Sequence, residues 1–344
     1  MTSLSVIQVG LGMWGRSWAE LVAKSPGLRL AAAVDAQAAA RDRVAATLGV
    51  PAFRSLERAL ASVDAQAVLV VSPPSTHRAF VEASLAEGRH VLVEKPLALT
   101  LADATAIAAA AQSASRHVMV AQNYRFRRQS RGLQRLVRDG SLGRLFGIRI
   151  ACRRDLRSSW ISQRDWRGRM PHPYLLDMAV HHVDLLRAIT GREVVEVDAR
   201  AWRAPDGPFR HEPTVEALLT LEDGTPVAYE GTWATPSRQT SWNGDWELVG
   251  ARARATWTGG GVADALRGTV RLERYGEGPA RVDLPALPAL DRLGALRDFR
   301  RAVETGDTPE CSAADNLRTL GALFALAHSV EQGRPVRIEE LAAT

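Results

Sequence analysis

Short apolar runs alternate with alanine-rich helical stretches over the first third of the chain. Apolar runs without polar alternation are typical of strands covered on both faces, and their alternation with helices predicts βαβ units around a parallel sheet. The strands are expected at Ser5–Val9, Leu28–Val34, Ala67–Val71, His90–Val93 and Val118–Ala121. The helices between them are expected near Trp14–Lys24, Ala38–Leu48, His77–Glu87 and Leu101–Ser113.

The pattern changes after residue 122. An irregular stretch rich in Trp and Arg precedes a helix that Gly191 ends, and strand-like runs separated by turn signals follow. These runs predict an open, largely antiparallel sheet. The expected strands are Leu145–Arg153, Val194–Trp202, Val215–Leu221, Val227–Thr235, Trp242–Val249, Ala253–Trp257 and Thr269–Tyr275. The expected helices lie near Ser130–Arg138, Leu175–Thr190, Asp291–Glu304 and Ser312–Glu331.

We therefore predict two domains in an α/β plus α+β protein. Residues 1–122 form a Rossmann domain with a doubly wound parallel sheet, and residues 123–344 form an α+β domain on an open mixed sheet, whose C-terminal helices pack back toward the first domain. A length of 344 residues supports two domains at one per ~100 to 200 residues. The content of 46% hydrophobic and 24% charged residues excludes disorder, collagen and coiled coil.

The chain carries two cysteines, Cys152 and Cys311, and no CxxC motif. This indicates neither a disulfide framework nor a zinc site. Met1–Gly15 lacks the basic n-region and the A-x-A cleavage site typical of a signal peptide, and no window approaches the ~18 uncharged apolar residues of a membrane helix. We expect a cytoplasmic protein with no membrane partner.

The net charge of +6 raises the question of an anionic partner. Of the 44 basic residues only Lys24 and Lys95 are lysines, and the densest basic run is Arg125–Arg138. Few aromatic residues are interleaved in that run, which favours a solvated or interdomain helix face over a nucleic-acid surface. We expect no nucleic-acid partner.

The segment Gly10-Leu-Gly-Met-Trp-Gly15 follows an apolar strand and opens a helix. In G-x-G-x-x-G the glycines permit a tight turn, close approach of a pyrophosphate and helix packing on the strand. Asp35, at the end of the second strand, is placed to accept hydrogen bonds from ribose hydroxyls and to repel a 2′-phosphate. Neither of the two residues after Asp35 is an Arg or Lys that could hold a 2′-phosphate, and the nearest following cation, Arg41, lies within the next helix. NAD is therefore favoured over NADP.

Two further segments end strands at the carboxyl edge of the predicted sheet. Ser72-Pro-Pro-Ser-Thr-His77 follows one strand, and His77 is open to a structural or a cofactor role. Glu94-Lys95-Pro96 follows another, at the edge where the nicotinamide half of a dinucleotide is expected. A lysine there is conspicuous in a chain that otherwise uses arginine.

The helix beginning at Leu175 carries Asp177, His181 and Asp184 at positions i, i+4 and i+7. These residues share one face, where an aspartate orients an imidazole for acid–base catalysis or forms a surface ion pair. His182 projects elsewhere and is interpreted as structural. The spacing lacks an H-x-x-x-H pair, so we expect no metal.

The order of these motifs resembles the Gfo/Idh/MocA family of NAD(P)-dependent oxidoreductases, which includes glucose-fructose oxidoreductase and inositol dehydrogenases. The resemblance covers nearly the whole chain and includes further motifs at Asn123-Tyr-Arg-Phe126 and Trp166-Arg167. It implies a second domain that forms the subunit interface, and a homodimer or homotetramer through the C-terminal sheet. It also implies that Lys95, Asp177 and His181 carry catalysis, and that the Lys95–Pro96 peptide bond is cis.

On this basis the cofactor residues are expected to be Gly10, Gly12, Met13, Trp14, Gly15, Asp35, Ser72, Pro73, Thr76, His77, Glu94, Lys95, Asn123, Trp166 and Arg167. The substrate residues are expected to be Tyr124, Arg125, Arg153, His172 and Tyr174. Many family members have a glycine triplet where this chain has Pro171-His-Pro-Tyr174. This departure weakens any transfer of a relative's sugar specificity.

We expect hydride transfer between NAD and a secondary alcohol of a sugar, cyclitol or related polyol. His181 is the expected proton acceptor, with Lys95 as the alternative. Arg153, Arg154 and Arg157 leave open an anionic substrate such as a uronate or sugar nucleotide. A non-catalytic NAD-binding regulator is a further alternative, although Lys95 and His181 are both present.

Overall fold

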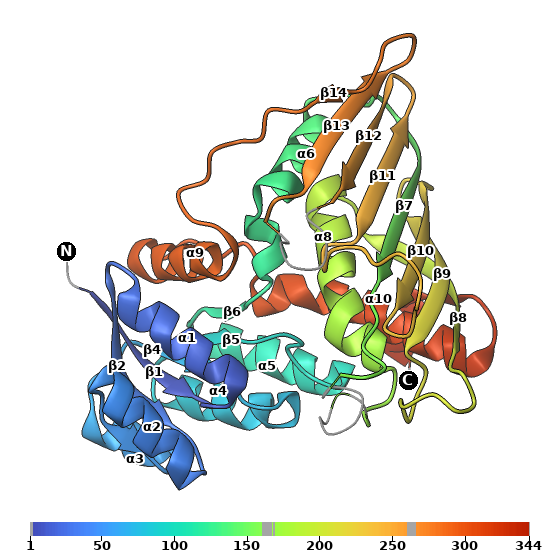
Figure 1. The fold of residues 1–344 in the computed structure, drawn as a ribbon. Coiled ribbons are helices and arrows are strands. Elements are labelled where there is room, and N and C mark those ends of the chain that lie inside the picture. Colours follow the sequence, from blue (N-terminus) through green and yellow to red (C-terminus); the bar gives the residue numbers. More distant parts are fainter. Residues whose placement is uncertain (1–2, 160–166, 168, 260–265, 344) are drawn as a thin grey trace. The chain divides into compact units, whose positions relative to one another are not determined.

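The computed structural model describes residues 3–159, 167, 169–259 and 266–343 (Figure 1). The chain divides into two compact units, Met1–Asn123 with Ala289–Leu317, and Tyr124–Pro288 with Arg318–Thr344. Helix α10 (Ala313–Gln332) runs across the boundary between them. The segment after residue 288 thus contributes to both units.

The first unit contains a six-stranded sheet in the order β3-β2-β1-β4-β5-β6, and all of its strand pairs are parallel. This is the strand order of a doubly wound dinucleotide-binding fold, which confirms the predicted fold class. The order reverses between β1 and β4, so the loops after these strands border the ligand crevice of such folds. The strands are β1 (Leu4–Val9), β2 (Leu28–Val34), β3 (Ala52–Phe53), β4 (Ala67–Val70), β5 (His90–Val93) and β6 (Val118–Val120).

Helices connect the strands of this unit, and α1 packs against α2 as α4 packs against α5 (Figure 1). The sequence did not predict β3 and α3, because β3 has two residues and α3 buries only Leu56 and Ala59. Gly49 ends α2 in the left-handed conformation, which glycine adopts readily at the end of a helix. The helices are α1 (Met13–Lys24), α2 (Ala38–Leu48), α3 (Leu56–Ser62), α4 (His77–Ala86), α5 (Leu101–Ser113) and α9 (Asp291–Thr305), with a 3₁₀ turn η1 (Pro74–Thr76).

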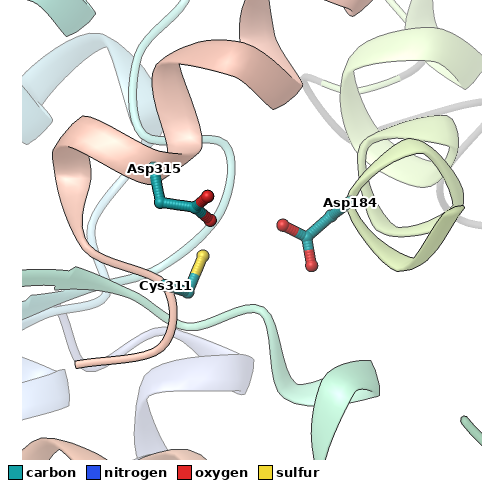
Figure 2. Close-up of side chains that lie close together, drawn as sticks. All are labelled: Asp184, Cys311 and Asp315. Carbon is teal, nitrogen blue, oxygen red and sulfur yellow. The ribbon is translucent and has the colours of Figure 1, made fainter. Parts of the chain in front are cut away.

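The start of α10 belongs to the first unit and is tied to the edge of its sheet. The amide of Val120 donates to the carbonyl of Cys311 over 2.8 Å, and the Cys311 side chain is buried. Figure 2 shows Cys311 and Asp315 at this helix start. The amide of Asp315 donates to Ser312 Oγ over 3.1 Å, so Ser312 caps the start of this helix.

The second unit contains a nine-stranded sheet in the order β14-β13-β12-β11-β7-β10-β9-β8-β15. Among the described strands of this sheet, only β7 and β10 pair in parallel, which confirms the predicted mixed, largely antiparallel sheet. The strands are β7 (Leu145–Arg153), β8 (Val194–Trp202), β9 (Thr214–Leu221), β10 (Pro226–Thr232), β11 (Asp245–Gly250), β12 (Ala253–Thr258), β13 (Thr269–Arg274), β14 (Ala280–Arg281) and β15 (Val336–Arg337).

The helices of this unit are α6 (Arg128–Arg138), α8 (Val180–Thr190) and most of α10, with short turns η2 (Asn123–Phe126), η4 (Leu175–Ala179) and η5 (Ile338–Ala343). Helix α6 packs on α8 and on β12 and β13 (Figure 1). None of the described helices is both long and apolar enough to cross a membrane.

Three expected elements differ in the structure. The strand expected to end at Thr235 ends at Thr232, and beyond it Ala234 forms an isolated bridge with Asp155. The strand expected from Trp242 begins at Asp245, because residues 240–243 turn instead and supply backbone carbonyls to buried side chains. The helix expected from Leu175 begins with a π-turn, η4, in which the amide of Val180 donates to the carbonyl of Leu175. Periodicity alone does not distinguish a π-turn from the first turn of an α-helix.

The basic run on η2 and α6 is engaged within the unit. Arg128 donates to the carbonyls of Leu284 and Pro285, and Arg135 donates to that of Asp283. The guanidinium of Arg131 lies 5.4 Å from the centre of the Phe126 ring. Arg128 and Arg135 therefore hold residues 283–285, which follow the last strand of the nine-stranded sheet before α9, against α6.

Candidate active site

The glycine-rich loop in the first unit has three glycines with different steric surroundings. Gly10 has φ of 93°, and a Cβ there would lie 2.5 Å from the carbonyl oxygen of Val71. A Cβ on Gly15 would overlap the carbonyl of Gly10, whereas a Cβ on Gly12 would meet nothing within 4 Å. Gly10 and Gly15 are thus required by the fold. Gly12 leaves open space, as a loop that receives a pyrophosphate must.

A buried amide braces the same loop. Gln8 lies within β1, and its Nε2 donates to the carbonyls of Gly10 over 3.0 Å and Gly15 over 2.6 Å. Gln8 was not among the predicted site residues. The available signal was an amide side chain inside a largely apolar strand.

Asp35 lies against the glycine-rich loop. Its Oδ2 accepts a hydrogen bond from the amide of Leu11, and its Oδ1 accepts one from the amide of Gln37, both over 2.8 Å. Arg41 Nη1 donates to the carbonyls of Asp35 and Ala36. The carboxylate is therefore held beside the open loop, and these residues fit the pyrophosphate and ribose of a dinucleotide.

The segment after β4 is held by His77, whose side chain is fully buried. Its Nε2 lies 3.0 Å from the carbonyl oxygen of Ser72, and its Nδ1 lies 3.0 Å from that of Pro96. Burial lowers the pKa of His77. The Ser72 and Thr76 hydroxyls are 2.7 Å apart, and Pro73 between them is exposed. The ring thus joins the two loops that carry Ser72 and Lys95.

Glu94 and Lys95 follow β5, and the Lys95–Pro96 peptide bond is cis. Glu94 Oε1 accepts hydrogen bonds from the indoles of Trp14 (2.9 Å) and Trp18 (2.7 Å), and Oε2 accepts one from the amide of Lys95. The guanidinium of Arg292 lies over both indoles. The lysine is thereby linked to the glycine-rich loop.

Three expected cofactor residues, Met13, Trp14 and Asn123, belong to the same unit as Glu94 and Lys95. Met13 and Trp14 are exposed on the first turn of α1, Trp14 to 48%, although both are large and apolar. Exposed apolar side chains beside a polar loop are typical of a ligand-binding surface. Asn123, after β6, donates through Nδ2 to Asp291 Oδ1 at the start of α9.

In the second unit, Asp177 lies on η4 and His181 on the first turn of α8. Asp177 Oδ1 accepts a hydrogen bond from Arg167 Nε over 3.2 Å. The His181 imidazole is 6% exposed and stacks on the Tyr124 ring, with centroids 4.1 Å apart and planes 6° apart. The structure thus shows two contacting pairs, Arg167 with Asp177 and Tyr124 with His181.

Arg127 lies on the opposite face of Tyr124. Its guanidinium carbon is 3.4 Å from the centre of the Tyr124 ring, and two planar groups at such distances cannot share one face. Arg127 also donates to Asn243 Oδ1. From the sequence, Arg127 was recognised only as a member of the basic run Arg125–Arg138, and its spacing did not indicate that it would stack on Tyr124.

Arg125 and Asp184 form a buried bidentate ion pair. Arg125 Nε and Nη2 each donate to one oxygen of Asp184 over 2.7 Å. Thr319 on α10 also donates to Asp184. Asp184 thus joins η2, α8 and α10 within the second unit, although the helix spacing had grouped it with Asp177 and His181.

The other expected substrate residues lie in different surroundings. Tyr174 is buried against β10, and its hydroxyl donates to the Cys152 carbonyl over 3.3 Å. His172 Nε2 lies 3.0 Å from Glu331 Oε1. Arg153 pairs with Glu230 over 2.6 Å on neighbouring strands of the sheet. Trp166, an expected cofactor residue, lies outside the described residues.

His182 is buried and serves the fold, as interpreted from the sequence. Its Nε2 lies 3.0 Å from the carbonyl oxygen of Trp242, and its Nδ1 lies 2.8 Å from the hydroxyl of Tyr229. Because a carbonyl only accepts, Nε2 carries the proton and Nδ1 accepts from Tyr229. Burial lowers the pKa of His182 to about 4, so the ring is neutral near pH 7.

Comparison with known proteins gives both sequence and structural matches. UDP-N-acetylglucosamine 3-dehydrogenase of Acidithiobacillus ferrooxidans is 28% identical over 94% of this chain and 96% of its own. Myo-inositol 2-dehydrogenase of Thermotoga maritima is 27% identical over 97% and 98%. An oxidoreductase structure from Agrobacterium radiobacter, in complex with NAD+, L-tartaric acid and magnesium, shares the fold at 19% identity, with a TM-score of 0.87 over 99% of this chain and 100% of its own.

Two family models match the chain in the expected order. The model described as "Oxidoreductase family, NAD-binding Rossmann fold" matches residues 4–122. The model described as "GFO/IDH/MocA C-terminal domain" matches residues 130–256. Together they cover more than half of the sequence, and the protein therefore belongs to the Gfo/Idh/MocA family of NAD-binding oxidoreductases.

Proposed function

We propose that this oxidoreductase uses NAD to interconvert a secondary alcohol and a ketone on a sugar, cyclitol or related polyol. The main support is the setting of His181, an imidazole stacked on Tyr124 one turn after Asp177. The two relatives named above act on a sugar nucleotide and a cyclitol according to their names, which favours this substrate class.

The first unit supplies the proposed cofactor contacts. The amides around Gly12 receive the pyrophosphate, and Asp35 accepts hydrogen bonds from the ribose hydroxyls. The Asp35 carboxylate repels a 2′-phosphate, which favours NAD over NADP. Further contacts are proposed from Ser72, Pro73, Thr76, Glu94, Asn123, Trp166 and Arg167. When bound, NAD supplies the hydride acceptor.

Four residues of the chain act on the proton and the developing charge. His181 takes the proton from the substrate hydroxyl, and Asp177 orients the imidazole for that transfer. Tyr124 keeps the imidazole plane fixed by stacking on it. Lys95 donates a hydrogen bond to the same substrate oxygen and stabilises its negative charge as the proton leaves.

The test is turnover of polyols and aldoses with NAD by the wild type and by His181→Asn. We expect the variant to bind NAD as the wild type does and to lose ~10² to 10⁴ in kcat, the usual contribution of a general base. Lys95→Met is the companion variant. If His181→Asn retained turnover while Lys95→Met lost it, Lys95 would be the proton acceptor. Undiminished turnover in both variants would refute the proposed machinery.

We also propose that the protein forms a homodimer or homotetramer through the nine-stranded sheet. A broad hollow on one face of this sheet is lined by residues of β7 through β12. Charges of both signs and an exposed leucine, Leu218, line it. Such a face can contact its own copy, because an isologous interface pairs each patch with itself.

A further inference from the structure

Arg154 follows β7 and is an almost fully buried arginine, with 5% of its surface exposed. Its Nη1 donates to the carbonyl of Thr240 over 3.0 Å, and its guanidinium lies 4.2 Å from the centre of the Trp242 ring. Its Nε is buried and has no hydrogen-bond partner among the described residues. A buried ionic donor without an acceptor is rare in native structures and calls for an explanation.

Two other buried arginines of the same unit show how a carboxylate compensates such a group. Arg125 and Arg187 are 7% and 5% exposed, and each binds a carboxylate side-on through Nε and Nη2. Their partners are Asp184 and Glu193. Within the described part of the chain, no carboxylate pairs with Arg154 in this way. The arrangement that compensates Arg125 and Arg187 is therefore incomplete at Arg154.

The neighbouring arginines do have carboxylate partners. Arg153 pairs with Glu230 over 2.6 Å, and Arg157 pairs with Asp155 over 2.8 Å. Of the three arginines that the sequence analysis considered for an anionic substrate, Arg154 is therefore the one without a protein carboxylate among the described residues. Sequence position alone gave no reason to prefer it to the other two.

Burial lowers the pKa of the Arg154 guanidinium, because a cation is less stable away from water. Burial also raises the pKa of the Cys152 thiol to about 11, so this thiol is neutral near pH 7 and does not balance the cation.

One segment, residues 240–243, links Arg154 to Arg127, the cation that stacks on the same Tyr124 ring as His181. The Thr240 carbonyl binds Arg154, and the Asn243 side chain binds Arg127, which stacks on Tyr124. We propose that Arg154 binds an anionic group, a carboxylate or a phosphate, on the substrate whose hydroxyl His181 deprotonates. This inference rests on the proposed dehydrogenase function and narrows its substrate class to acidic sugars and cyclitols.

The test compares neutral and anionic members of matched series: an aldose, its uronate and its 6-phosphate, in the gluco, galacto and manno series. Binding to the NAD-loaded protein is measured by calorimetric titration, and turnover is measured separately by the absorbance of reduced nicotinamide. We expect the wild type to bind an anionic member at least ~10-fold more tightly than its neutral parent. The uronate and phosphate arms identify which anion is preferred.

Arg154→Gln is expected to lower affinity for the preferred anion by ~10- to 100-fold and to change affinity for the neutral parent by less than about 3-fold. Arg154→Lys keeps the charge but loses the fork, so an intermediate loss is expected, and it serves if the glutamine variant does not fold. Arg138→Gln, on the exposed surface of α6, removes the same charge from the same unit and should bind like the wild type.

Equal wild-type affinity for neutral and anionic members of every series would overturn the inference. So would equal losses for both members in Arg154→Gln. Turnover of neutral polyols without an anion preference would refute the role of Arg154 alone. An anion preference abolished in Arg154→Gln, with no turnover of any alcohol, would instead support the anion site and refute the dehydrogenase proposal.

Discussion

The glycines of the cofactor loop separate the needs of folding from those of binding. Gly12→Ala places a methyl group where the structure has open space, at φ of −59°, so the fold should tolerate it. The same methyl group would fill the space proposed for the pyrophosphate. We expect unchanged thermal unfolding and at least ~10-fold weaker NAD binding, measured by titration.

Gly15→Ala provides the contrast, because its methyl group would overlap the Gly10 carbonyl. Overpacking of this kind costs about 1 to 3 kcal/mol, and we expect a lower melting temperature even without NAD. If Gly12→Ala bound NAD as the wild type does, the pyrophosphate would not occupy this loop.

The residues of the candidate site were predictable to different degrees. Motif spacing identified Gly10 to Gly15, Asp35, Lys95 and the pair Asp177 and His181, because these spacings follow from local backbone geometry. The spacing did not reveal that Arg125 pairs with Asp184, or that no carboxylate in the described part of the chain pairs with Arg154. Those facts depend on contacts between segments far apart in the chain.

At the scale of elements, the π-turn η4 is held by contact between Tyr174 and β10. Gly231 on β10 faces the Tyr174 ring so closely that a Cβ there would overlap it. Gly231→Ala should therefore displace Tyr174 and the adjacent turn that carries Asp177. We expect a loss of about 1 to 3 kcal/mol in the free energy of unfolding, measured in urea, together with reduced kcat.

Gly147 on β7 is the matched control for this prediction. A Cβ there would lie 3.7 Å from the nearest atom, the Pro226 carbonyl oxygen, which is an ordinary contact. Gly147→Ala should leave stability and kcat close to those of the wild type. A Gly231→Ala protein with unaltered kcat would show that η4 does not depend on this packing.

Element boundaries were predictable where a single periodicity dominated. The strands of the parallel sheet were recognised because burial on both faces makes them continuously apolar. The strand expected from Trp242 was placed too early, since an aromatic residue in a turn has the same apparent β-preference as one in a strand. The two-residue β3 has too short a pattern to recognise.

At the scale of the whole molecule, the open face of the nine-stranded sheet is the surface on which assembly is proposed. Leu218 on β9 is 54% exposed on this face, and Asp198 and Ala228 lie opposite it on the neighbouring strands. Arg149, Glu216 and Glu247 also line the hollow. An exposed leucine among charges of both signs suits a self-complementary contact.

Leu218→Glu should therefore prevent assembly, because it buries an additional carboxylate in the contact with each copy. We expect the wild type to sediment as a dimer or tetramer and the variant to sediment as a monomer. Leu293→Glu is the control, since Leu293 is an exposed leucine on α9 of the first unit and should not change the mass. A monomeric wild type, or an assembled Leu218→Glu protein, would mean that this face does not hold the copies together.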